Sequence, residues 1–224
     1  WLKENFKGKE FHDTVYITSN PFVDIIIDEG AFYRIHSLWQ TEWDEKLGSI
    51  RPEEVRKKSE KLCEDYQDKR IIIHFMQPHY PFIGNRQLGG KSAWEVEGER
   101  VRIGHNEETP WDALERGNTS KEEVWAAYKE NLELGLNEAE KLKDNLKGKT
   151  VISSDHGNLL GEEVFPLVDD YGHTPGVLVE KNVKVPWVEF QNGERKKVKE
   201  NTPEKPSVDK NEEIKGKLED LGYM

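Results

Sequence analysis

The stretch Arg70-Ile71-Ile72-Ile73-His74-Phe75-Met76 is a continuous apolar run that ends at the turn signal Gln77-Pro78. A strand that is half exposed alternates apolar and polar residues, whereas a strand covered on both faces of a sheet does not. The proline behind the run removes a backbone donor and marks the point where the strand ends. This segment therefore predicts a strand buried inside a layered α/β sheet.

Working outward from this run, three further segments are predicted to be strands, at residues 14–18, 150–154 and 185–190. Helical periodicity occupies residues 52–66 and 120–146 between them. The second helix is expected to begin at Ser120, because Glu123 follows it at capping-box spacing. Strands that alternate with helices are typical of a mostly parallel central sheet with helices on its faces. The predicted fold class is therefore α/β.

The chain divides into two unequal parts by composition. Residues 1–190 carry the strand and helix patterns and are predicted to form one α/β domain, with a long excursion at about 84–117. The tryptophans of this excursion are expected to pack, although Trp94 and Trp111 could also line a pocket. Residues 191–224 are polar and are predicted to be a linker followed by a short helix over 211–221.

Charge and composition narrow the classes of partner. The 224 residues carry 33 basic and 44 acidic side chains, for a net charge of −11, and binding to nucleic acid needs a basic footprint. No apolar run reaches the length of about 18–20 residues that a membrane-spanning helix needs. Nucleic acid and a membrane span are therefore not expected, a cytoplasmic location is the default, and the oligomeric state stays open. The single cysteine, Cys63, is predicted to lie on a core-facing side of a helix.

Side chains that can bind metals follow two of the predicted strands. Asp155 and His156 come directly after residues 150–154, and Gly157 allows the backbone to turn sharply behind them. His79 follows the strand at residues 70–76. Ligands of open α/β sheets bind beyond the carboxyl ends of the strands, so these residues are candidates for a metal site. On spacing alone, an Asp-His pair that only forms a turn and caps a helix is an equally good interpretation.

The motif Ser-Asp-His-Gly-Asn-Leu-Leu-Gly-Glu at residues 154–162 closely resembles the signature of the sulfatases and their relatives in the alkaline phosphatase superfamily. The segment His-Phe-Met-Gln-Pro-His-Tyr-Pro-Phe at residues 74–82 resembles an upstream segment of the same family. Looser similarities at residues 14–21, 185–187 and 218–223 extend the resemblance over most of the chain. It implies an alkaline-phosphatase-like fold.

This resemblance also implies a function, which is metal-dependent hydrolysis or transfer of a sulfate or phosphate ester. The substrate would be a small molecule or a glycan ester. Asp155 and His156 match two ligands of one or two divalent ions, which could be Mn, Zn, Mg or Ca. His79 matches a histidine that contacts the substrate oxyanion or leaving group. His173 matches a downstream basic residue that holds the oxyanion or donates a proton.

The sequence also departs from the family pattern. The first metal ligand and the nucleophile are expected before Trp1, so the chain is expected to lack the N-terminal part of the fold and to be inactive alone. Gln77 replaces an aspartate, and Asn158 stands where many relatives carry glutamate. The alternative function is a non-catalytic binding or assembly module that kept the fold without the nucleophile. A metal-free scaffold is a third interpretation.

Overall fold

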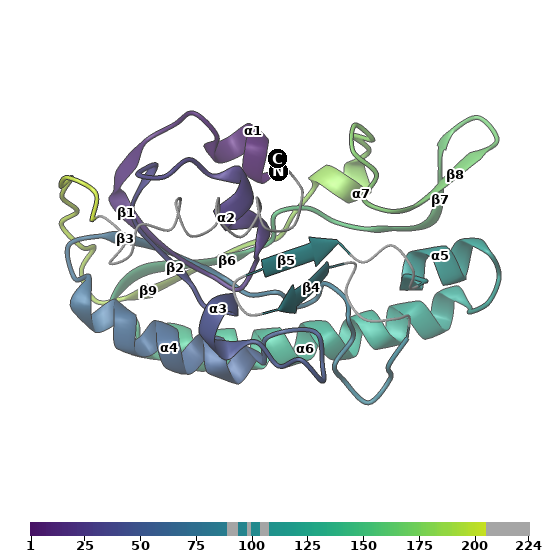
Figure 1. Ribbon diagram of the computed structural model, residues 1–224, viewed down its shortest axis with the longest axis horizontal. Helices are drawn as coiled ribbons and strands as arrows, with labels where there is room; N and C mark the ends of the chain where they lie inside the picture. The colour runs from purple at the N-terminus through teal and green to yellow at the C-terminus, as the bar shows by residue number, and fades with distance from the viewer. Residues whose placement is uncertain (89–93, 98–99, 104–107, 205–224) are drawn as a thin grey trace.

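The computed structural model describes residues 1–88, 94–97, 100–103 and 108–204 of the chain. Its centre is a three-stranded parallel sheet in the order β2-β1-β3, shown in Figure 1. The strands are β1 (Phe11–Thr18), β2 (Phe32–Ser37) and β3 (Arg70–His74). The chain is therefore mixed α/β with a parallel sheet, as predicted. β2 was not predicted, because its residues Phe-Tyr-Arg-Ile-His-Ser lack a continuous apolar run.

The predicted single sheet is wrong for the two later strands. β6 (Gly148–Ser153) and β9 (Trp187–Asn192) pair antiparallel with each other in a separate two-stranded sheet. In the part of the chain that the structure describes, β6 has no other strand partner. A short apolar run reveals that a strand exists, but pairing depends on residues far away in the sequence.

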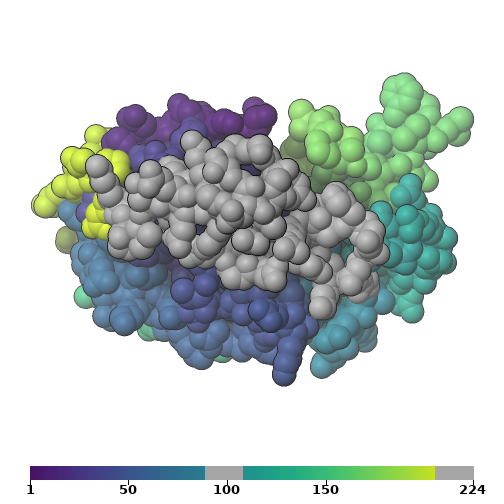
Figure 2. All heavy atoms as spheres, in the orientation of Figure 1, coloured from purple at the N-terminus to yellow at the C-terminus, as the bar shows by residue number. Residues whose placement is uncertain are grey.

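Two hairpins complete the strands. The excursion at 84–117 contains β4 (Trp94–Glu97) and β5 (Arg100–Ile103), which pair antiparallel. β7 (Leu159–Phe165) and β8 (Val168–Gly172) form the second hairpin. Figure 2 shows this second hairpin projecting from the body of the molecule. Neither hairpin was predicted, because neither has the Asn-Gly or Asp-Gly turn that marks a short hairpin in a sequence.

Helices cover both faces of the parallel sheet. α1 (Leu2–Phe6) and α2 (Phe22–Ile26) lie on one face, and α4 (Pro52–Asp65) and α6 (Lys121–Asn145) lie beyond the other (Figure 1). The shorter helices are α3 (Trp39–Glu42), α5 (Pro110–Glu115) and α7 (Glu180–Val183). The side chains of Ser120 and Glu123 form the predicted capping box at the start of α6. No helix of the described residues is long and apolar enough to cross a membrane.

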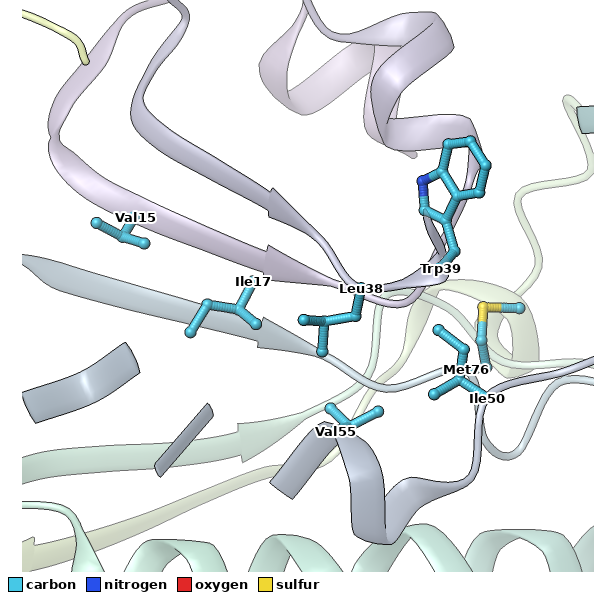
Figure 3. Packing of buried hydrophobic residues seen from close by; sticks show 7 residues of the cluster. All are labelled: Val15, Ile17, Leu38, Trp39, Ile50, Val55 and Met76. Carbon is cyan, nitrogen blue, oxygen red and sulfur yellow. The ribbon is translucent and has the colours of Figure 1, made fainter. Parts of the chain in front are cut away.

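Two of the three clusters of the core lie on opposite faces of β1, and the third contains Tyr80, Phe82 and Ala127. The cluster on the α4 face, shown in Figure 3, contains seven buried side chains: Val15, Ile17, Leu38, Trp39, Ile50, Val55 and Met76. Tyr16 points to the opposite face, where it packs with Leu2, Val23 and Phe32. Val15, Tyr16 and Ile17 are all fully buried. β1 is therefore covered on both faces, as its continuous apolar sequence predicts.

A polar segment returns to the sheet after β9. The amide of Lys199 donates to the carbonyl of Asp68 at 2.9 Å, and that of Glu204 donates to the carbonyl of Tyr33 at 2.9 Å. Lys69 is 2% exposed, and its ammonium donates to the Lys199 carbonyl at 3.0 Å and to the side chain of Asn201. Residues 199–204 are therefore fixed to the body. The helix predicted over 211–221 lies outside the described residues.

Candidate functional site

The four site residues predicted from the sequence come from three loops. Asp155 and His156 follow β6 at its carboxyl end, His79 lies in the loop after β3, and His173 follows β8. The ring centroids of His156 and His173 are 4.2 Å apart, and those of His79 and His173 are 6.3 Å apart. The fold therefore brings three imidazole rings together from segments far apart in the sequence.

Gly157 fixes the loop that carries Asp155 and His156. Its amide donates to the carbonyl of Asn182 at 2.8 Å. A Cβ at this position would lie 1.9 Å from the carbonyl oxygen of Lys181, so no other residue fits without a backbone shift. The loop is therefore pressed against α7 through a contact that glycine alone permits.

The hydrogen bonds of His156 define which of its ring nitrogens is available. Its Nδ1 lies 2.9 Å from the carbonyl oxygen of Gly157, and a carbonyl only accepts, so Nδ1 carries the proton. In the neutral ring, Nε2 then holds the lone pair. This Nε2 lies 3.5 Å from Oδ2 of Asp155. An imidazole nitrogen and a carboxylate oxygen therefore face one another, about a third exposed to solvent.

His79 is held by contacts on both sides of its residue. Its Nδ1 donates to the carbonyl of Tyr80, and its own carbonyl accepts from Nδ2 of Asn131 at 2.8 Å. Asn131 lies fully buried on α6, and its Oδ1 accepts from the amide of Ile83 at 3.1 Å. Burial lowers the pKa of the His79 ring to about 4, and the neighbouring His173 adds to this effect. The ring is therefore neutral near pH 7.

His173 is tied to Asn158, the residue that departs from the family pattern. Nδ1 of His173 donates to Oδ1 of Asn158 at 3.0 Å. The amide nitrogen of Asn158 is left to donate to the hydroxyl of Tyr128, and this bond opposes the burial that raises the Tyr128 pKa. Partial burial and then the nearby His156 lower the pKa of His173 to about 4. The outer side of this ring remains open to solvent.

Three further residues are held within the protein. Nδ1 of His74, within β3, lies 2.9 Å from the hydroxyl of Tyr16. Gln77 is buried and donates to the carbonyl of Ile50 at 3.0 Å. Cys63 is also buried on α4, and burial raises its pKa to about 11, so its thiol stays protonated.

A pocket of about 370 Å³ opens beside the histidines. His79 and His173 lie in its wall, together with Phe22, Tyr80, Thr109, Trp111, Asp112, Tyr171, Gly172 and Thr174. Trp111 could be suspected from the sequence only as one aromatic residue of a long excursion. Asn131 carried no signal, because a polar residue within a helix usually faces solvent, and Asn158 was marked only as a departure from the glutamate of similar sequences.

The arrangement offers Asp155 and His156 as two adjacent donors for a metal ion. Among the described residues, no group of three or more histidine, cysteine, aspartate or glutamate side chains is arranged to hold one. The expected position at the end of a central strand is also corrected, because the described partner of β6 is β9 alone. Comparisons with models of protein families, with curated proteins and with solved structures each gave no match.

Proposed function

We propose that this chain has an alkaline-phosphatase-like fold and carries part of the site of a metal-dependent hydrolase or transferase of sulfate or phosphate esters. One observation supports the proposal more than any other. His79, His156 and His173 come from three loops, and their rings lie within 4.2 and 6.3 Å of one another beside a pocket. Imidazoles gathered at a pocket are typical of proton transfer and metal binding.

Asp155 and His156 are the proposed metal donors. The carboxylate supplies a hard oxygen, and Nε2 of His156, which holds the lone pair when the ring is neutral, supplies a nitrogen. Of the four candidate ions, this mixed pair fits Zn or Mn better than Mg or Ca, because Mg and Ca prefer oxygen ligands. A divalent ion, when bound, polarises the ester and stabilises the negative charge that develops on its oxygens.

His79 and His173 are the proposed proton carriers. Both rings use Nδ1–H in a hydrogen bond to the protein, which places the lone pair of the neutral ring on Nε2. Each ring therefore accepts a proton at Nε2 first, and can donate from that atom to a leaving-group oxygen only afterwards. Asn158 and the carbonyl of Tyr80 keep the two rings in this tautomer.

A non-catalytic binding module is the second candidate. It is favoured by the lack, among the described residues, of a third carboxylate or imidazole placed to complete a metal site with Asp155 and His156. In that case the pocket would bind a ligand without converting it.

Titration calorimetry with Zn²⁺ and with Mn²⁺ tests the metal proposal. We expect one binding site, weakened at least about tenfold by Asp155→Asn and by His156→Gln. His12→Gln and Asp13→Asn are the matched controls, because both residues lie near the amino end of β1, which runs parallel to β3 and is therefore at the end away from the loop that carries His79. They should bind the metal like the unchanged chain.

Equal affinity in the site and control variants would refute the metal site. Turnover is measured in parallel with an aryl sulfate, a phosphate monoester and a phosphate diester. Metal binding without turnover would leave the ligand assignment standing and favour the binding module. Metal-dependent turnover that Asp155→Asn abolishes would establish the enzyme.

A further inference from the structure

The pocket beside the histidines has a wall of aromatic rings. Four of its lining residues are aromatic and come from α2, from the loop after β3, from α5 and from β8: Phe22, Tyr80, Trp111 and Tyr171. Aromatic rings stack on other flat rings and on apolar faces, and they add little conformational cost when they are already held in place. The composition of the wall therefore points to the shape of the group that binds there.

Trp111 is held by contacts on several sides. Its indole contacts Phe82 and Tyr128, with ring centroids 6.4 Å away in both cases. On another side it lies against Gly172, where a Cβ would come 3.1 Å from Cδ1 of the indole. Gly172 also has a φ of +72°, a conformation that glycine adopts without strain. Trp111 is therefore a preformed platform at the pocket wall.

Two hydroxyl groups of the wall already donate hydrogen bonds within the protein. The hydroxyl of Thr109 donates to Asp112 at 2.7 Å as part of the cap of α5. The hydroxyl of Thr174 donates to Asp170 at 2.7 Å. A sugar or other polyol needs many free donors and acceptors, and both of these hydroxyl protons are spent. These two threonines therefore offer a ligand no hydroxyl donor, whereas four aromatic rings line the same wall.

We infer that this pocket holds the organic group of the substrate, that it selects a flat aromatic ring over a polyol, and that Trp111 is the residue that determines this specificity. The inference rests on the proposed function for the ester chemistry, but the binding of the ring itself needs no metal. A volume of about 370 Å³ lies at the lower end of the range of ligand sites, about 300–1,000 Å³, so the group is small.

Saturation-transfer NMR with metal-free protein and a chelator tests the inference. The probes are phenol, cyclohexanol and methyl glucoside, which represent a flat ring, a puckered apolar ring and a polyol. We expect phenol to bind most strongly and methyl glucoside most weakly. Trp111→Leu should weaken phenol about 2- to 10-fold, because the variant keeps an apolar side chain but loses the aromatic face.

Trp187→Leu is the matched control, because Trp187 is 66% exposed on β9 and lies outside the pocket wall. Circular dichroism checks that each variant is folded. If Trp111→Leu is not folded, Tyr171→Leu takes its place. Methyl glucoside binding as well as phenol, or phenol affinity unchanged by both wall variants, would overturn the inference. Loss of metal binding in calorimetry would instead count against the proposed function and leave this result unaffected.

Discussion

Replacing Gly157 by alanine should destabilise the chain by about 2–4 kcal/mol. The added methyl group would lie 1.9 Å from the carbonyl oxygen of Lys181, so the loop and α7 must move apart. That movement breaks the 2.8 Å hydrogen bond from the Gly157 amide to the Asn182 carbonyl. Forcing an extra methyl group into a packed contact costs about 1–3 kcal/mol, and losing the bond costs about 1 kcal/mol more.

The assay is urea denaturation followed by circular dichroism, with the free energy of unfolding extrapolated to water. Gly176→Ala is the control, because Gly176 has a φ of +88° but no atom within 4 Å of the added methyl group. Gly176→Ala should destabilise the chain by only about 1–2 kcal/mol, which is the cost of placing alanine in this left-handed backbone conformation. A Gly157→Ala chain within about 0.5 kcal/mol of the unchanged chain would refute the reasoning, since random surface changes have effects of that size.

Three further outcomes are expected. Asn131→Ala should cost about 2–4 kcal/mol in urea denaturation, because a fully buried amide that makes two hydrogen bonds is lost. Lys69→Met keeps the buried stem but removes the ammonium, so hydrogen exchange should show faster exchange of the amides of residues 199–204. Burial, and then the charge of Arg34, lowers the pKa of His36 to about 4 in the folded chain. As the pH falls, the unfolded chain therefore binds a proton at His36 before the folded chain does. Stability should therefore be complete above about pH 6.5 and fall by at most about 3 kcal/mol towards pH 4, and a His36→Gln chain measured over the same range should lack this component.

The sequence predicted the helices and strands whose formation depends on residues close together in the chain. Ser120 and Glu123 marked the start of α6, because a capping box needs only four residues. Continuous apolar runs marked β1 and β3 as strands. Only β1 is buried on both faces, whereas β3 lies at the edge of the described sheet and its side chains are partly exposed, so the predicted burial of β3 is wrong. The pairing of β6 with β9 left no such mark, since it depends on residues that are far apart in the sequence.

The candidate site likewise contains residues that the sequence could predict and residues that it could not. Asp155 and His156 could be selected because they are adjacent and follow a strand directly. The roles of the groups that hold the rings were not predicted, because Asn131 lies within a helix, where polar residues are ordinary, and Asn158 showed only a departure from glutamate. Their importance arises only from contacts with His79 and His173, and those contacts form across the fold. A single sequence carries no local trace of them.

The hydrogen bond between Lys69 and residue 199 joins two residues that the ribosome synthesises at different times. The two residues are 130 positions apart, and a ribosome adds about 5–20 residues each second. The three parallel strands have thus been made for about 7–26 seconds before the carbonyl that receives the Lys69 ammonium exists. During that interval the lysine must stay in water, with the amino-terminal end of the sheet uncovered. Residues 199–204 therefore cover the sheet only after all three of its strands have been synthesised.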